Sequence, residues 1–146
     1  MIKDKLKEWF GRYALAEFVA LIIALVFSNL SMKLSGNIIL SGFIGTWTDN
    51  LGFYGIITHM DLRKNIKRKG KLKFKDYLIE LRNDIVEFGP SEYLDSFIIR
   101  PFCLSFFPYV ISDYSFAIII GTILADISYY IPTIASYEFR KKIFKD

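Results

Sequence analysis

The stretch Gly121-Thr122-Ile123-Leu124-Ala125-Asp126-Ile127-Ser128-Tyr129-Tyr130 places one carboxylate in a mostly apolar run. An earlier stretch, Gly45-Thr46-Trp47-Thr48-Asp49-Asn50-Leu51-Gly52-Phe53-Tyr54, has the same outline. Both begin with Gly-Thr, carry an Asn or Asp five residues after the glycine, and close with an aromatic pair. Each is followed by an acidic-apolar-Arg-Lys sequence, at 61–64 and 138–141. We therefore predict an internal repeat that relates residues 9–64 to residues 84–142.

The composition of the chain predicts an all-α membrane protein. Hydrophobic residues make up 53% of the 146 residues and aromatic residues 17%, which is high for a soluble domain of this length. A hydrocarbon core about 30 Å thick requires roughly 20 mostly apolar residues per helix. Four segments meet that requirement, at about 13–32, 38–60, 91–111 and 116–137. We expect a single domain, 1–146, whose four transmembrane helices form two tandem hairpins.

The alternative fold is a soluble helical bundle, which would place charged and other polar residues at helical period along each helix. Residues 20–27 and 116–124 contain no charged residue. Charged segments with apolar residues at helical spacing precede each hairpin, at 1–12 and 74–88. We expect both to form short amphipathic helices in the headgroup layer, the second of them ended by Gly89-Pro90.

The distribution of Lys and Arg predicts the orientation, because these residues collect on the cytoplasmic side of a membrane. Four precede the first span, nine lie between residues 63 and 82, and four follow the last span. Only Lys33 falls in an outer loop and only Arg100 within a span. We predict a multi-pass protein of the cell membrane with both termini and a basic loop, 61–90, in the cytoplasm.

The net charge of the chain and its distribution also indicate which binding partners to expect. A net charge of +4 is compatible with nucleic-acid binding, but here the basic residues follow the positive-inside pattern, and we expect no nucleic acid. Membrane lipids are the expected partners, with anionic headgroups attracted to 63–75. Four short spans enclose little volume, which predicts a homo-oligomer or a partner subunit. The single cysteine, Cys103, excludes a disulfide or thiolate metal site within the chain, and we expect neither metal nor cofactor.

A polar set inside the spans is the candidate site. Arg100 lies about midway along the third span and requires counterions, because a guanidinium does not deprotonate and an unpaired charge in hydrocarbon is costly. Asp126, joined to it through a short outer turn, is the expected partner, and Asp49 is the second. Pro101 removes the amide that would bond the Phe97 carbonyl and is expected to kink the helix. The predicted site comprises Asp49, Asn50, Glu92, Asp95, Arg100, Asp126, Tyr129 and Tyr130.

Small residues near the carboxylates of the second and fourth spans predict close helix packing, because small side chains let helix backbones approach each other in lipid. Asp49 is then expected to face a neighbouring helix, since exposing it to lipid costs at least about 2.5 to 3.5 kcal/mol. The predicted packing residues are Gly42, Gly45, Gly52, Gly121 and Ala125.

Two short motifs, Arg12-Tyr13 before a span and Gly42-Phe43-Ile44-Gly45-Thr46 within one, resemble the GtrA-like family. The resemblance implies four spans and a role in moving polyprenyl-linked sugars. The second motif lies here in the second span of its pair instead of the first, and Arg100 and Asp126 have no counterpart in the family pattern. We therefore do not assign the chain to that family.

Three functions fit these features. The first is transport by a small carrier, channel or lipid-translocating protein, in which Arg100 binds an anionic group and Asp126 or Asp49 exchanges a proton or counterion. The second is a membrane enzyme acting on a lipid, although the sequence has no hydrolase elbow, zinc motif or P-loop. The third is a non-catalytic assembly or anchoring subunit, whose basic amphipathic loop contacts a soluble partner. A structural alternative for the polar set is that its ion pairs simply hold the bundle together. We favour transport, because ionisable groups within spans generally mark functional sites.

Overall fold

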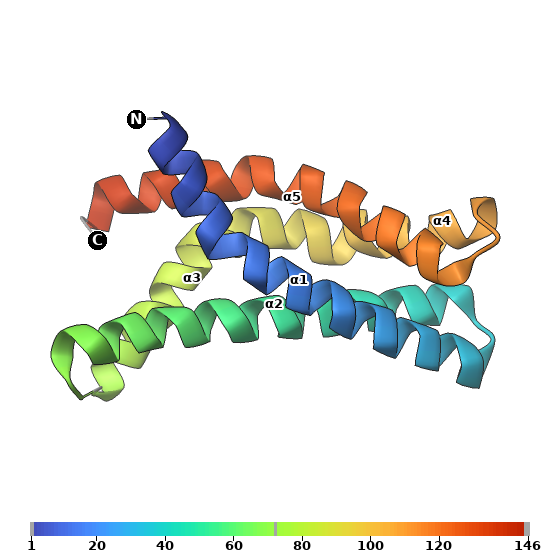
Figure 1. Ribbon diagram of the computed structural model, residues 1–146, viewed down its shortest axis with the longest axis horizontal. Helices are drawn as coiled ribbons and strands as arrows, with labels where there is room; N and C mark the ends of the chain where they lie inside the picture. Colours follow the sequence, from blue (N-terminus) through green and yellow to red (C-terminus); the bar gives the residue numbers. More distant parts are fainter. Residues whose placement is uncertain (1, 72, 145–146) are drawn as a thin grey trace.

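The computed structural model describes residues 2–71 and 73–144. These residues form four helical rods joined by short connections (Figure 1). The rods are α1 (Ile2–Ser35), α2 (Ile38–Lys69), a third rod composed of α3 (Phe74–Leu94), the π-helical turn η1 (Asp95–Ile99) and α4 (Arg100–Val110), and α5 (Tyr114–Phe144). The all-α prediction is confirmed. Met1 and residues 145–146 of the predicted domain, and Leu72 of the predicted basic loop, lie outside the described residues.

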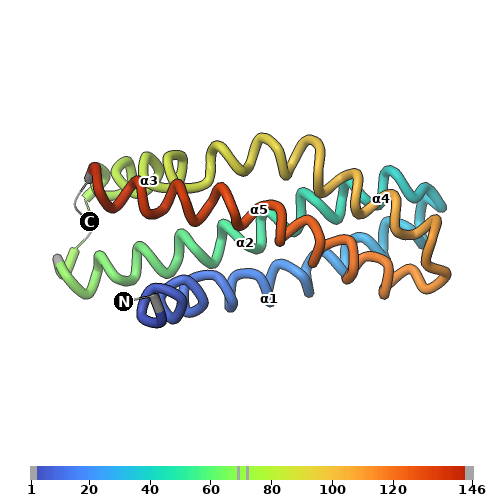
Figure 2. The backbone as a smooth tube through the Cα atoms, turned by 90° about the horizontal axis from the view of Figure 1, so that it is seen from above, coloured from blue at the N-terminus to red at the C-terminus, as the bar shows by residue number. Residues whose placement is uncertain are grey.

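The rods pack as two antiparallel hairpins. α1 packs along α2 and the third rod packs along α5, while α1 and the third rod lie on opposite sides of the bundle (Figure 2). Both chain ends and the connection at 70–73 lie at one end, and the turns at 36–37 and 111–113 lie at the other (Figure 1). The termini and the α2–α3 connection thus share one end of the bundle.

Local sequence explains where the helices begin and end. Gly36 and Gly70 follow α1 and α2 with φ of 64° and 76°, a conformation that glycine adopts without a Cβ clash. Asn37 caps α2 by accepting a hydrogen bond from the Leu40 amide at 3.0 Å. Asp113 caps α5 in the same way, because its Oδ1 accepts a hydrogen bond from the Phe116 amide at 2.7 Å. These caps permit the tight turns that keep each hairpin antiparallel.

Three boundary predictions are wrong. The segment 1–12 is not a separate surface helix, because α1 continues without a break from Ile2. The loop 61–90 is mostly helical, and the connection shrinks to residues 70–73. Helix 74–88 does not end at Gly89-Pro90, since α3 runs through Pro90 into the third rod. A proline inside a helix removes one hydrogen bond, whereas ending the helix there would leave four carbonyl groups to satisfy.

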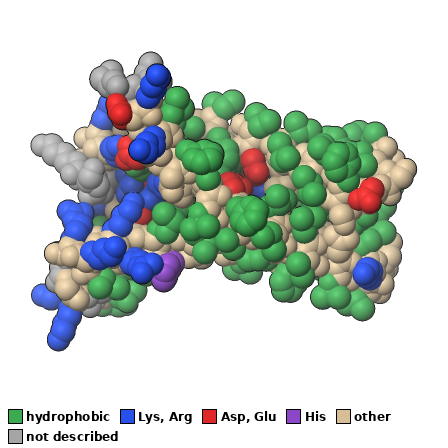
Figure 3. Space-filling view, in the orientation of Figure 1, with side chains coloured by type: hydrophobic (Ala, Val, Ile, Leu, Met, Phe, Trp, Pro, Cys, Tyr) green, Lys and Arg blue, Asp and Glu red, His purple; other side chains and the backbone are tan. Residues whose placement is uncertain are grey.

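The distribution of side chains is the reverse of that in a soluble protein. Among the described residues, 19 polar or charged residues are buried against 14 hydrophobic ones. Large hydrophobic side chains cover the outside of the bundle, and the basic residues gather at the end that carries the termini (Figure 3). By length and composition, two of the described helices, α1 and α5, can cross a membrane. The four-span arrangement stays a prediction, because α2 and the third rod carry more polar residues.

Candidate functional site

The site begins at an irregularity in the third rod. The Arg100 amide donates to the Asp95 carbonyl, five residues back, and so closes the π turn η1. The turn lies immediately before Pro101, which has no amide to continue the ordinary helical ladder. The expected proline kink thus takes the form of a π turn, a feature often found at functional sites. It places Asp95 and Arg100 side by side, with Arg100 Nε 2.6 Å from Asp95 Oδ2.

Arg100 is surrounded by three carboxylates from three segments. Nη1 donates to Asp49 of α2 at 2.6 Å and Nη2 donates to Asp126 of α5 at 2.8 Å. With Nε bonded to Asp95, each nitrogen of the guanidinium has a carboxylate partner. The side chains of Arg100 and Asp49 are each 3% exposed, and that of Asp126 is 17% exposed. We call these four residues the Arg100 cluster. Arg100 thus contacts both predicted partners, and its donors are directed at protein groups instead of an open site.

The Arg100 cluster contains more acid than base. Three carboxylates face one guanidinium, and Glu17 of α1 lies near Asp126. Within the described part of the chain, Asp49 Oδ1 and Asp95 Oδ1 are buried without a hydrogen-bond partner. The cluster therefore has both the surplus charge and the unused oxygens that favour bound protons.

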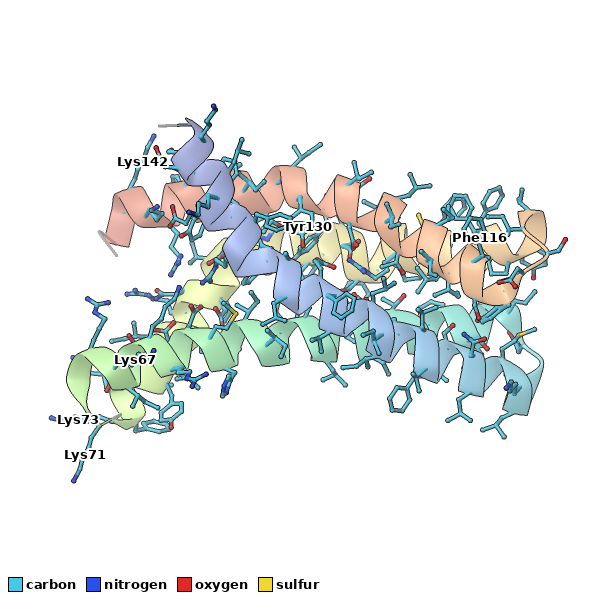
Figure 4. All side chains as sticks on the ribbon, in the orientation of Figure 1. Lys67, Lys71, Lys73, Phe116, Tyr130 and Lys142 are labelled. Carbon is cyan, nitrogen blue, oxygen red and sulfur yellow. The ribbon has the colours of Figure 1, made fainter. Side chains whose placement is uncertain are left out.

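Two tyrosine–glutamate pairs border the Arg100 cluster. The Tyr54 hydroxyl of α2 donates to Glu92 of α3, and the Tyr130 hydroxyl of α5 donates to Glu17 of α1. Tyr130 is labelled in Figure 4, between α5 and α1. The predicted repeat matches Tyr54 with Tyr130 and Glu17 with Glu92. Residues at matching positions therefore make matching contacts between the two halves.

The remaining predicted residues lie around Glu92. Asn50 Nδ2 donates to Glu92 at 3.0 Å and to the Ser96 hydroxyl at 2.6 Å. The Tyr129 hydroxyl lies 3.2 Å from that of Tyr54. The predicted site thus divides into the Arg100 cluster and a neighbouring group around Glu92. The site predicted from the sequence did not include Glu17, although the predicted repeat of 9–64 in 84–142 pairs Glu17 with Glu92.

The small residues allow the helices to approach closely enough for these contacts. A Cβ on Gly42 would lie 2.5 Å from Ser105 Oγ, and one on Gly121 would lie 3.1 Å from the Cys103 carbonyl oxygen. A Cβ on Gly45 would lie 3.0 Å from Leu104, and one on Gly52 3.0 Å from the Ala20 Cα. Ala125 is fully buried beside Asp126. Larger side chains at Gly42, Gly45 or Gly121 would separate α2 or α5 from the third rod, which carries Arg100, and one at Gly52 would separate α2 from α1.

A second buried ion cluster lies at the end that carries the termini, and sequence reasoning missed it. Arg12 of α1 donates to both oxygens of Asp61 in α2, at 2.7 and 2.9 Å, and to both oxygens of Glu87 in α3, at 3.1 and 3.0 Å. Arg140 of α5 lies 3.3 Å from Glu87. The Tyr13 hydroxyl donates to Glu87 at 2.8 Å. We call Arg12, Asp61, Glu87 and Arg140 the Arg12 cluster, which joins all four rods.

Each tyrosine–glutamate pair lies at a groove in the outer surface of the bundle. A groove between α1 and α5 has a volume of about 710 Å³ and is lined by Phe10, Ala14 and Ile134 as well as by Glu17 and Tyr130. A second, of about 640 Å³, lies between α2 and the third rod and contains Tyr54 and Glu92. Figure 3 shows acidic side chains in the middle of the apolar surface. Two carboxyl groups can thus be reached from the outside of the bundle.

Comparison of the chain with known protein families, curated proteins and solved structures finds no match. The resemblance to the GtrA-like family therefore has no support from a family match. What the site does must be inferred from its own chemistry.

Proposed function

We propose that the protein is a four-span membrane protein that exchanges protons at the Arg100 cluster as part of transport. The observation that supports this proposal best is the surplus of buried carboxyl groups over one guanidinium. Removing a charge from water costs several kcal/mol after relaxation, and a surplus charge has no partner to offset that cost. Bound protons neutralise the surplus, and their release and uptake give the cluster two states.

The membrane setting is supported by the distribution of side chains. Hydrophobic residues on the outside of the bundle would contact lipid, and the buried polar residues would then satisfy one another. The basic end of the molecule carries both termini and the α2–α3 connection (Figure 1). The positive-inside rule places that end in the cytoplasm. We therefore propose four spans with both termini cytoplasmic.

The proposed mechanism differs in one respect from the expectation that Arg100 binds an anionic substrate. Each guanidinium nitrogen already donates to a carboxylate, so Arg100 is engaged by protein groups. Arg100 instead fixes Asp49, Asp95 and Asp126 in place, and Asp126 and the nearby Glu17 exchange the proton. The groove between α1 and α5 reaches Glu17 from outside. Four rods enclose little volume, so a transport path would require a second copy or a partner subunit.

The test is proton movement in liposomes that contain the purified protein and a trapped pH indicator. Under an imposed membrane potential, the wild type is expected to move protons, while Glu17→Gln and Asp126→Asn abolish the flux. The control is Glu138→Gln, which removes a carboxylate from an ion pair with Lys5 at the cytoplasmic end and is expected to leave the flux unchanged. Equal flux in all three variants, or none in the wild type, would contradict the proposal and favour an assembly or anchoring role.

A further inference from the structure

A polar pocket opens at the cytoplasmic end, outside the Arg100 cluster. It has a volume of about 450 Å³, within the range of small-ligand sites, and is lined by residues of α1, α2, α3 and α5. Its lining includes Arg12, Asp61 and Tyr137. Arg12 and Arg140 lie against the Tyr137 ring, each with its guanidinium carbon 5.4 Å from the ring centre. The basic side chains at this end are visible in Figure 3.

The carboxylates of this pocket are occupied by protein donors. Asp61 accepts from Arg12, Glu80 accepts from Asn65, and Glu8 accepts from Tyr137 at 2.6 Å. Asp76 accepts from the Lys73 amide at 2.8 Å as the cap of α3. These bonds fix the positions of the four carboxylates without removing their charge. The lining also holds five cations, so its net charge is +1, from Arg12, Lys64, Arg68, Arg140 and Lys141 against Glu8, Asp61, Asp76 and Glu80.

Two of those cations lie one helical turn apart on α2, at Lys64 and Arg68. Lys64 is 64% exposed, and its nearest carboxylate oxygen, on Asp61, is 4.0 Å away. Across the described ranges 2–71 and 73–144, Arg68 makes no ion pair or hydrogen bond. Residues i and i+4 of a helix lie on the same face, so both cations can reach one ligand in the pocket.

We propose that this pocket binds a phosphate group, with Lys64 and Arg68 as its charged donors. Arg presents a planar fork that matches phosphate oxygens, and Lys adds a mobile point charge. The phosphate could belong to a soluble phosphate ester or to a phospholipid headgroup, because the pocket opens at the predicted level of the membrane surface. Both sources offer the same oxygens to the same two side chains.

The experiment compares two double variants with equal loss of charge. Lys64→Gln with Arg68→Gln removes the pocket cations, and Arg63→Gln with Lys67→Gln removes two cations of the same helix that do not line the pocket. One arm titrates inorganic phosphate into the detergent-solubilised protein by calorimetry. The other measures, by native mass spectrometry, retention of phosphatidic acid against phosphatidylcholine from nanodiscs that contain both.

We expect the pocket variant to weaken binding of at least one probe by roughly tenfold or more, from the loss of charge-assisted hydrogen bonds. The control variant is expected to bind like the wild type, and unchanged thermal unfolding would show that both variants fold. Binding of inorganic phosphate indicates a soluble ligand, and selective retention of phosphatidic acid alone indicates a headgroup. Equal weakening in both variants, or no binding of either probe by the wild type, would overturn the proposal.

Discussion

The Arg100 cluster and the Arg12 cluster both join separate helices through buried ion pairs, but they differ in the ratio of carboxylates to guanidinium groups. In each, a buried arginine joins carboxylates from separate helices. Around Arg12, two carboxylates face two guanidinium groups, since Arg140 also contacts Glu87. Around Arg100, three carboxylates face one guanidinium, with Glu17 close by. A balanced cluster can simply hold helices together, whereas an unbalanced cluster inside an apolar shell requires protons and can therefore respond to them.

The largest expected effect comes from removing the guanidinium of the unbalanced cluster. Arg100→Leu leaves Asp49, Asp95 and Asp126 buried without a cation. We expect a loss of about 3–5 kcal/mol in the free energy of unfolding, as for other broken buried ion pairs. Chemical denaturation in detergent micelles measures it. A loss below about 1 kcal/mol, the range of exposed ion pairs, would show that the carboxyl groups are already neutral without Arg100.

Arg12→Leu makes the same change in the balanced cluster. Glu87 keeps its contact with Arg140 and the Tyr13 hydroxyl, so fewer groups are left unsatisfied. We expect a loss of about 1–3 kcal/mol, the cost of buried acceptors without a donor. The same denaturation experiment measures it. The comparison between the clusters fails if Arg12→Leu destabilises the protein more than Arg100→Leu.

The packing that brings Asp126 to Arg100 gives a smaller effect. Gly121→Ala places a Cβ 3.1 Å from the Cys103 carbonyl oxygen, a backbone atom that cannot move aside alone. We expect a loss of about 1–2 kcal/mol from overpacking between α4 and α5. The matched control is Gly55→Ala, where the new Cβ meets nothing within 4 Å. The control should gain up to about 1 kcal/mol from helix propensity, and equal losses in both variants would contradict this explanation.

The smallest effect is a pH dependence beside the Arg12 cluster. Burial, together with the nearby carboxylates of Asp61 and Glu87, raises the pKa of Asp84 from 3.8 to about 6. The folded state therefore binds a proton more tightly than the unfolded state, so Asp84 favours folding at low pH and loses that contribution as the pH rises through about 6. Asp84→Asn should flatten the dependence of the melting temperature between about pH 4 and 7. An unchanged dependence would exclude Asp84 as its source.

Periodicity and apolar content predicted the helices well, because both depend on short sequence windows. The helix boundaries were harder to predict. The helix-breaking tendency of Pro90 was overridden by the continuous rod. Pro101 predicted an irregularity in the third span, but not that it would be a π turn at 95–99. The observed boundaries differ from the predicted ones because they depend on tertiary packing, and a short sequence window carries no information about that packing.

In the candidate site, too, some contacts could be predicted from local sequence and others depend on tertiary packing. The short turn between the third and fourth spans indicated that Arg100 and Asp126 could meet, and the structure has them in contact. Arg12 and Glu87 are 75 residues apart and lie in charged segments that resemble solvated surface helices. They meet because α1, α2, α3 and α5 converge at this end of the bundle, where the Arg12 side chain reaches both Asp61 and Glu87. Long-range ion pairs of this kind cannot be identified from one sequence without the fold.

The proposed function requires that buried carboxyl groups around Arg100 hold a proton at neutral pH. Infrared spectroscopy of the protein in lipid measures it directly, because protonated carboxyl groups have a carbonyl stretch that carboxylates lack. We expect this band in the wild type at neutral pH, its loss in Glu17→Gln with Asp126→Asn, and its retention in Glu138→Gln. A wild-type spectrum without the band would mean that every carboxyl group is ionised, which would contradict the account.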